Sequence, residues 1–455
     1  MISAKEYAKR RAQLLTKMNT NSCMVLFSGC DLKASEDQTH EFWVNRNFYY
    51  LTGITQQNSV LVLVKYTKTR ARSILLVDEV DENRVKWMGR MIHKEEAKKI
   101  SGCESVFYKD KAKEFYESPD LKRLWDIFNS HYVYLDLSDH NFIKQEYTTQ
   151  QFASSLSDKK IKVRNIYEEI VKMRMIKSPA EIEEIKKSIH VTNLGLQSVL
   201  KNLAPGKYEY QMSSLFEYTI KDHNFSGLSF PTIAASGENA VILHYPTPTA
   251  LMEDKTLLLL DLGAEKDMYR ADISRTYPVN GKFTQQQKDI YEMVLRCNKA
   301  VQQYIRPGVT LKSCQEFAFD YLKGELITRG YISTIKAHEE ANAEIADLMK
   351  KDPSKILSDS EKSDIYLKKL NEQVFKYYYH SVGHHLGLDV HDACIRELPL
   401  KPGMVITDEP GLYMKEYGIG VRIEDDILVT EDGSINLSSE IIKEVEDIEN
   451  FMKNN

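Results

Sequence analysis

The chain has 455 residues, a length that exceeds what one small hydrophobic core organises and that predicts two domains. Apolar residues make up 42% of the sequence and charged residues 28%, which is ordinary for a globular protein. Lys and Arg number 61 against 66 Asp and Glu, so the formal net charge is −5. Because there is no basic surplus, neither nucleic acid nor an anionic membrane surface is expected as a partner.

Three further features predict a cytoplasmic protein. Apolar runs such as Val60–Val64 and Leu257–Leu260 are far shorter than the roughly 20 residues of a membrane-spanning helix. The first residues run into charged positions without an apolar segment, so no signal peptide is expected. The six cysteines are scattered without a CxxC pair, which is typical of free thiols in a reducing compartment.

The first part of the chain alternates predicted strands with predicted helices. Short apolar runs predict strands at Ser59–Val64, Ser73–Val77 and Tyr132–Leu137. Charged segments with apolar residues at helical spacing lie between them at Glu82–Lys99 and Lys111–Phe128. This alternation predicts an α/β domain over residues 1–165. No cluster of catalytic residue types occurs there, so we expect this domain to have a supporting or oligomerising role.

A second domain is expected over residues 166–455. Ser178, Pro179 and Glu181 form a strong helix start, and apolar residues follow at helical spacing. A second long helix is predicted at Thr284–Tyr304, and strand-like segments with polar residues surround both helices, which indicates an α+β domain. Thr334–Leu370 is rich in Lys, Glu, Asp and Ser, and it predicts a solvated helical excursion.

Two carboxylates lie close together in the sequence of the second domain. Asp261 follows a run of four leucines, and Asp272 comes eleven positions later. A turn at Lys266-Asp267 would place the two carboxylates directly opposite each other in an antiparallel hairpin, with Cβ atoms about 5 Å apart. Two carboxylates so close repel each other unless a proton or a cation lies between them. The pair therefore predicts a metal site.

Two more carboxylates, Glu409 and Glu424, lie in strand-like segments further along the chain. Arg422 and Glu424 alternate with apolar residues, so we expect them to share one strand face. The simpler alternative to a functional role for Arg422 is that it only forms a salt bridge with Glu424. Asp408 points away from Glu409 in an extended chain, and it is interpreted as a structural or solvated residue.

Histidines concentrate near the third quarter of the second domain. Four of the twelve histidines, His380, His384, His385 and His391, fall within twelve residues, and His244 is expected at a strand end upstream of Asp261. Four carboxylates with one or two imidazoles suit Mn²⁺, Co²⁺ or similar ions. So many acids indicate two ions that share a water-derived hydroxide. Residue chemistry alone leaves both a dinuclear phosphatase and a dinuclear peptidase open.

The order of these residues resembles that of a known family. The five metal ligands of the pita-bread-fold metallopeptidases are matched in order by Asp261, Asp272, His384, Glu409 and Glu424. The segments 236–239, 384–392 and 409–413 are similar to the proline-specific branch, which comprises Xaa-Pro aminopeptidases and Xaa-Pro dipeptidases. Asn47-Phe-Tyr-Tyr-Leu-Thr-Gly53 is similar to the N-terminal domain of the aminopeptidases. The resemblance implies an α/β N-terminal domain followed by an α+β pita-bread catalytic domain.

The resemblance also implies a role for each metal-site residue. Asp261 would chelate one ion, and Asp272 and Glu424 would bridge both ions. His384 and Glu409 would complete the ligand set of the other ion. Glu409 would also receive the proton of the attacking hydroxide.

Four further residues match substrate-handling positions of the family. His380 and His391 would hold the substrate carbonyl or stabilise the tetrahedral intermediate. His244 matches a histidine linked to binding of the substrate amine and to proton movement. Arg422 matches a residue that positions the substrate.

The resemblance therefore implies hydrolysis of an N-terminal Xaa-Pro bond, with two divalent ions, expected to be Mn²⁺, and a homodimer or larger assembly. An Xaa-Pro dipeptidase would use the same site. A non-enzymatic peptide-binding pita-bread domain or a metal-free creatinase-like hydrolase would be expected to lack some of the five ligands. A phosphatase is disfavoured because no basic cluster accompanies the acids. Asp408, His385 and the long segment Thr334–Leu370 depart from the usual family pattern.

Overall fold

The computed structural model describes residues 2–109, 132–137, 144–158, 161–223, 227–354 and 356–454. The chain forms two compact units, Met1–Arg174 and Met175–Asn455. The division falls within helix α8 (Tyr167–Met175), a short distance after the position that the sequence suggested, near Asn165. None of the helices within these ranges combines the length and the apolar composition that crossing a membrane requires.

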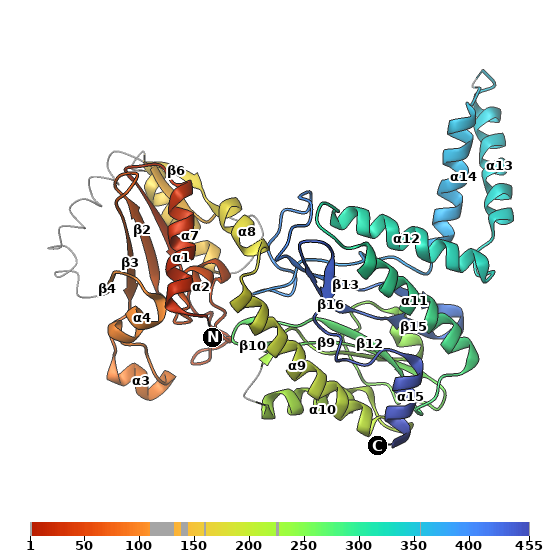
Figure 1. Ribbon diagram of the computed structural model, residues 1–455, viewed down its shortest axis with the longest axis horizontal. Helices are drawn as coiled ribbons and strands as arrows, with labels where there is room; N and C mark the ends of the chain where they lie inside the picture. The colour runs from red at the N-terminus through yellow and green to blue at the C-terminus, as the bar shows by residue number, and fades with distance from the viewer. Residues whose placement is uncertain are drawn as a thin grey trace. The chain divides into compact units, whose positions relative to one another are not determined.

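The first unit is built on a six-stranded mixed sheet in the order β4-β3-β2-β1-β5-β6 (Figure 1). The pairs β1–β2 and β2–β3 are antiparallel, whereas β3–β4, β1–β5 and β5–β6 are parallel. The strands are β1 (Ser22–Phe27), β2 (Val60–Lys65), β3 (Ala71–Val77), β4 (Ser105–Tyr108), β5 (Tyr132–Leu135) and β6 (Lys162–Asn165). The three strands predicted from the sequence are confirmed, with small shifts at their ends.

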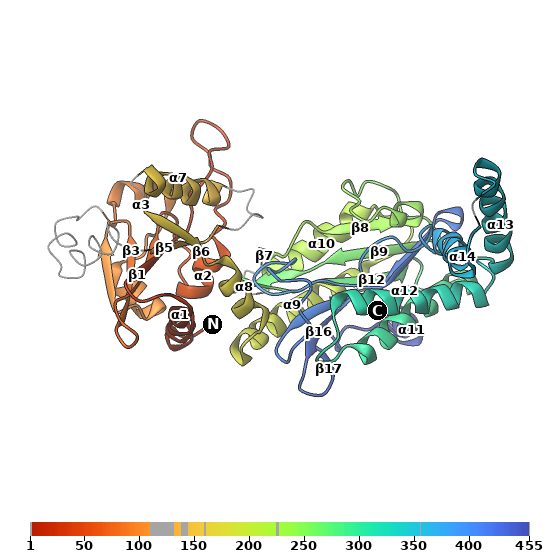
Figure 2. The same ribbon diagram turned by 90° about the horizontal axis from the view of Figure 1, so that it is seen from above.

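Helices cover both faces of this sheet. Figure 2 shows α7 over one face and α1 over the other. Leu156 of α7 packs against a core that includes Val25 and Val62. The predicted helical segment Glu82–Lys99 is divided into α3 and α4 by Gly89, which has a positive φ. The predicted helix at 111–128 lies outside the described residues. The helices are α1 (Ala4–Lys17), α2 (Arg46–Thr52), α3 (Glu82–Met88), α4 (Lys94–Ser101) and α7 (Lys144–Asp158).

The second unit combines small antiparallel sheets with long helices, as the α+β prediction requires. The strands are arranged as β11-β10-β7, β12-β9-β8, β13-β16-β17 and the pair β14-β15. They are β7 (Gly227–Leu228), β8 (Ile233–Ser236), β9 (Leu257–Leu262), β10 (Ala264–Lys266), β11 (Tyr269–Arg270), β12 (Ile273–Pro278), β13 (Val405–Asp408), β14 (Gly411–Met414), β15 (Ile419–Arg422), β16 (Asp425–Val429) and β17 (Ser434–Asn436).

The long helices of the second unit begin where the sequence predicts. The Ser178 side chain accepts from the Glu181 N–H and the Glu181 side chain accepts from the Ser178 N–H, a capping box that starts α9. Thr284 and Gln287 form the same arrangement at the start of α11. The helices are α9 (Pro179–Asn202), α10 (Glu209–Asp222), α11 (Gln285–Tyr304), α12 (Leu311–Thr328), α15 (Val445–Asn454) and the short 3₁₀ helices η1 (Gly237–Val241) and η2 (Lys415–Tyr417).

The charged segment before the histidine motif is a helical hairpin, which confirms the predicted excursion. Helices α13 (Thr334–Lys351) and α14 (Asp359–Val374) run side by side and project from the rest of the second unit (Figure 1). At the base, the Gln373 side chain hydrogen-bonds both backbone groups of Ser333, at 2.9 and 3.1 Å. The hairpin is therefore a self-contained element that joins the unit at one end.

Candidate active site

The register of β9 and β12 places the first two carboxylates on one face of the sheet. Asp261 pairs with Ser274, not with Asp272, so the predicted direct pairing is wrong. The turn is formed by Asp267 and Met268, whose φ angles are 50° and 74°, one residue later than predicted. A two-residue hairpin turn with positive φ at both positions usually contains Gly or Asn, and neither occurs here. The residue that pairs with Asp261 is thus Ser274, two positions after Asp272. Because side chains two residues apart in a strand face the same side, Asp272 stays on the same face as Asp261.

Three of the predicted donors converge on one point. Asp272, His384 and Glu424 each offer one ligand atom, and these atoms lie within 4.8 Å of one another. The His384 Nε2 atom is 3.3 Å from Asp272 Oδ2 and 3.6 Å from Glu409 Oε1. Glu409 follows β13 and Glu424 follows β15, so ends of separate strand pairs bring these side chains together. This donor set has the composition of a divalent-cation site.

Hydrogen bonds from the neighbouring backbone orient His384. Its Nδ1 atom lies 3.1 Å from the carbonyl oxygen of His385, which can only accept, so Nδ1 carries a proton and Nε2 faces the carboxylates. The backbone N–H of His384 donates to Thr407 Oγ1 at 3.0 Å, and Thr407 donates to Glu409 Oε1 at 3.4 Å. Burial lowers the pKa of His384, but the hydrogen bond to Asp272 and the nearby carboxylates raise it to about 9. This raised pKa refers to a second proton, on Nε2, and a cation bound at Nε2 would replace it.

Arg422 connects the carboxylates through short hydrogen bonds. Its Nη2 atom lies 2.7 Å from Asp261 Oδ2, and its Nε donates at 2.7 Å to Ser274 Oγ, which in turn donates to Glu424 Oε2 at 2.7 Å. Its Nη1 donates to the Tyr413 hydroxyl at 3.0 Å. Arg422 thus forms its salt bridge with Asp261 and not with Glu424. It reaches Glu424 only through the Ser274 hydroxyl.

The carboxylates of this cluster have little solvent to stabilise their charges. Burial, together with the charge of Asp272, raises the pKa of Asp261 to about 6, although Arg422 opposes this shift. Burial also raises the pKa of Glu409 to about 7 and holds the pKa of Glu424 well above its ordinary value. Within the described part of the chain, the buried Asp261 Oδ1 atom has no hydrogen-bond partner. A buried carboxylate oxygen without a donor, beside other acids, fits a site that holds cations.

The remaining predicted histidines lie around this cluster. The Tyr413 hydroxyl and His380 Nε2 are 2.7 Å apart, and His380 Nδ1 is 3.8 Å from Glu409 Oε2. The ring centroid of His391 is 4.1 Å from that of His384. His244 is exposed in a turn after η1, which corrects the predicted strand end, yet its charge influences the pKa values of Asp261, His380 and His391. The structure thus brings all nine predicted residues to one region.

Asp408 and His385, the two departures from the family pattern, are both buried. Asp408 is fully buried and accepts from Asn298 Nδ2 at 3.3 Å, so it is a structural residue and the solvated alternative is wrong. His385 is also buried, and burial together with the Lys177 charge lowers its pKa to about 3. Ser274 is a site residue that was not predicted from the sequence. The i, i+2 spacing of Asp272 and Ser274 within a strand could have revealed that both face the site.

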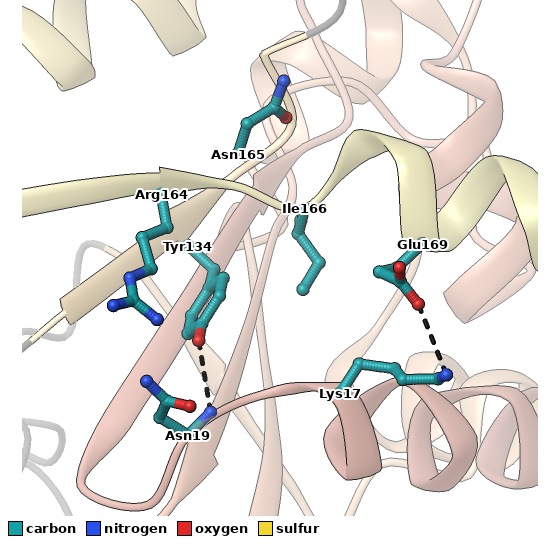
Figure 3. A pocket seen from close by; sticks show the side chains of 7 residues that line it. All are labelled: Lys17, Asn19, Tyr134, Arg164, Asn165, Ile166 and Glu169. Carbon is teal, nitrogen blue, oxygen red and sulfur yellow. Dashed lines mark hydrogen bonds and ion pairs between the residues drawn. The ribbon is translucent and has the colours of Figure 1, made fainter.

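A separate pocket lies in the first unit (Figure 3). Lys17 pairs there with Glu169 at 3.5 Å, and the Tyr134 hydroxyl accepts from the Asn19 backbone N–H at 3.2 Å. The pocket contains none of the predicted site residues. It is lined by Lys17, Asn19, Tyr134, Arg164, Asn165, Ile166 and Glu169.

Comparisons with known proteins match both parts of the chain. Residues 183–431 match the metallopeptidase family M24, and residues 7–119 match the aminopeptidase P N-terminal domain. Among the relatives are the Xaa-Pro aminopeptidases of Escherichia coli, with 29% identity over 99% of this chain and 98% of that protein, and of Haemophilus influenzae, with 30% identity over 98% and 97%.

Solved structures match over the whole length. A Bacillus anthracis protein described as a candidate aminopeptidase P has a TM-score of 0.87 and 36% identity, over 100% of this chain and 99% of that one. Zinc-substituted E. coli aminopeptidase P in complex with product has a TM-score of 0.82 and 28% identity, with the same coverage. The match to family M24 spans more than half of the chain, and its range of 183–431 includes all nine predicted site residues. The chain therefore belongs to metallopeptidase family M24, in its Xaa-Pro aminopeptidase branch, and its second unit has the pita-bread fold.

Proposed function

We propose that this protein is a metal-dependent aminopeptidase that hydrolyses the bond between an N-terminal residue and a proline in the second position. The observation that carries the proposal is the convergence of Asp272, His384 and Glu424 beside Glu409, in a chain that matches Xaa-Pro aminopeptidases along nearly its whole length. An Xaa-Pro bond is a tertiary amide without an N–H and with a restricted shape, so it requires a site built for it.

For the metal ions, we propose that two divalent ions would be held by five residues: Asp261 would serve one ion, His384 and Glu409 the other, and Asp272 and Glu424 both. The unpartnered Asp261 Oδ1 atom and the raised pKa values of Asp261 and Glu409 support this assignment. Two divalent ions, when bound, supply Lewis acidity that lowers the pKa of water at the site. Mn²⁺ is the proposed ion, because oxygen donors dominate the set.

Glu409 is the proposed proton acceptor and donor. Its carboxylate lies beside the proposed ligand histidine, with Oε1 3.6 Å from His384 Nε2, so it is placed to accept a proton from water at the site and to return it. His380 carries no imidazolium proton to donate at neutral pH, because burial and the Arg422 charge lower its pKa to about 3. The proton that the prolyl nitrogen needs as it leaves is therefore assigned to Glu409 rather than to His380.

The other polar residues are assigned to the substrate. His391 and His380 would hold the substrate carbonyl or stabilise the tetrahedral intermediate, and the exposed His244 would contact the substrate and assist proton movement. Arg422 is buried, and its guanidinium is engaged with Asp261, Ser274 and Tyr413. We therefore assign to Arg422 an indirect role, in which it positions these groups and not the substrate itself.

An Xaa-Pro dipeptidase remains the second candidate, since the same donors would serve it. The aminopeptidase is favoured because the match to the aminopeptidase P N-terminal domain accompanies the catalytic unit. A homodimer or larger assembly and a cytoplasmic location complete the proposal.

The deciding experiment is a cleavage assay that compares Xaa-Pro dipeptides with longer Xaa-Pro peptides, before and after chelator treatment. We expect cleavage of the longer peptides, loss of activity with the chelator and recovery with Mn²⁺ or Co²⁺. Cleavage of dipeptides alone would identify a dipeptidase. Full activity in thoroughly metal-stripped protein would refute the metal mechanism.

A further inference from the structure

Residues 384–392, here called the histidine loop, carry two of the proposed site residues without belonging to a helix or a named strand. His384 begins the loop and His391 lies next to its end. A loop that holds catalytic side chains to within a fraction of an ångström needs supports outside itself. The structure contains one such support that the proposed mechanism does not use.

The support is an ion pair buried against the loop. Lys177 Nζ lies 3.0 Å from Asp392 Oδ2, and the two side chains are only 1% and 2% exposed. The second oxygen of Asp392, Oδ1, accepts from the backbone N–H of Asp389 at 3.3 Å. Two charges removed from water are tolerated only when they pair with each other and when hydrogen bonds satisfy their other atoms. The ion pair therefore holds Asp392, the last residue of the histidine loop, in one position.

The backbone around the ion pair is fitted to it. A Cβ atom at Gly387 would lie 2.6 Å from Asp392 Oδ2 and 2.9 Å from Lys177 Cε, so a glycine is needed for the pair to form. The backbone N–H of Lys177 donates to the Gly403 carbonyl at 2.8 Å, just before the capped start of α9. The pair thus attaches the middle and the end of the histidine loop to the beginning of a long helix.

A short chain of hydrogen bonds leads from the ion pair to His384. The carbonyl oxygen of His385 accepts from the backbone N–H of Asp392 at 2.8 Å, and it also contacts His384 Nδ1 at 3.1 Å. The position of Asp392 therefore sets the carbonyl that orients the His384 ring. His391 directly precedes Asp392, and its ring lies 4.1 Å from the ring of His384. One anchored residue thus controls both histidines.

We propose that the buried Lys177–Asp392 ion pair positions His384 toward the metal site and places His391 beside it. Lys177 and Asp392 are then positioning residues, and neither touches the substrate. The catalytic part of this inference rests on the proposed function, whereas its effect on metal binding does not. A purely structural ion pair is the alternative, and it would affect the free energy of unfolding without a separate effect on the site.

The test compares the Lys177→Met variant with the double variant Lys177→Met/Asp392→Leu. The single variant leaves a buried carboxylate without its partner, whereas the double variant replaces the pair with apolar side chains, which often restores stability. Lys187→Met is the matched control. Lys187 lies on α9 and pairs with Glu184 at 3.0 Å, but it is 51% exposed and lies outside the loop. For each protein we would measure the thermal midpoint, the Kd for Mn²⁺ without substrate, kcat and KM.

We expect Lys177→Met to lower the thermal midpoint and to weaken Mn²⁺ binding about 10- to 100-fold, the usual range for residues that orient ligands. The double variant should regain the thermal midpoint while Mn²⁺ binding and kcat stay reduced and KM changes less than kcat. Lys187→Met should match the unsubstituted protein. A double variant with normal stability, normal Mn²⁺ affinity and normal kcat would overturn the proposal.

Two further outcomes are decided by the same measurements. If Lys177→Met fails to fold, the Kd for Mn²⁺ and the kcat of the double variant alone distinguish an effect on the position of His384 from an effect on the free energy of unfolding. If the unsubstituted protein binds Mn²⁺ but cleaves no Xaa-Pro peptide, the proposed function fails. The Kd values would still show whether the ion pair controls His384.

Discussion

At the scale of single residues, burial and neighbouring charges set the pKa values of the groups in the site. Asp261 and Glu409 are ordinary carboxyl groups in the sequence, but burial raises their pKa values to about 6 and about 7. His384 shifts to about 9, because its bond to Asp272 outweighs the effect of burial. All three groups therefore hold a proton at higher pH than their free forms do.

These shifts predict that Mn²⁺ affinity rises with pH. A cation must displace protons from Asp261, Glu409 and His384, and each displaced proton contributes up to about tenfold in affinity per pH unit below that group's pKa. We expect binding to tighten at least about tenfold from pH 6 to pH 7, with protons released. Isothermal titration calorimetry in buffers of different ionisation enthalpy would count those protons. An affinity that is constant from pH 6 to pH 8 would contradict the assigned ligands.

A second prediction concerns the adjacent histidines. His384→Ala should lose bound metal and reduce turnover by about 100-fold or more, because His384 Nε2 faces Asp272 and Glu409. His385→Phe should stay folded and metallated, with a rate within about tenfold of normal, because its side chain is buried and the charges that influence it, those of Lys177, Asp392 and His384, include none of the metal-site carboxylates. Elemental analysis and a turnover assay on both variants provide the measurement. Metal loss in His385→Phe with retention in His384→Ala would show that the ligand assignment is wrong by one residue.

At the scale of elements, local signals in the sequence predicted helix starts better than strand pairing. The Ser178 capping box lies within four residues, so the sequence contains all of it. The pairing of Asp261 with Ser274 depends instead on a turn at Asp267-Met268 that has neither Gly nor Asn. The sequence therefore predicted the donor residue types and their order, but it could not predict the links that cross from strand to strand, such as Ser274 to Glu424.

The α13–α14 hairpin leads to the third prediction. Its helices support each other, with Lys369 Nζ 2.7 Å from Glu344 Oε2 and the rings of His338 and Tyr366 stacked at 3.8 Å. Replacing residues 337–369 with a short Gly-Ser linker should therefore leave Mn²⁺ affinity and turnover of a short Xaa-Pro peptide within about 0.5 kcal/mol of normal. Thermal unfolding, calorimetry and a kinetic assay would check this. Loss of metal binding would show that the hairpin supports the site.

At the scale of the whole molecule, the expected selectivity is a property of the assembled site. The fourth prediction is that replacing proline with alanine in the second substrate position lowers kcat/KM at least about tenfold, or about 1.4 kcal/mol. Peptides that differ only in the first residue serve as the control, since that change leaves the proline in place. Equal kcat/KM values for Xaa-Ala and Xaa-Pro peptides would identify a general aminopeptidase.

The order of the donors along the chain has a consequence for biosynthesis. Asp261 is made first and Glu424 last, and the residues between them include His384 and Glu409. A ribosome must therefore pass residue 424 before any nascent chain can offer the complete donor set. Because domains generally fold from the N-terminus as they emerge, the first unit can fold while the donors are still incomplete. The growing polypeptide would thus be protected from premature peptidase activity by the order of its own synthesis.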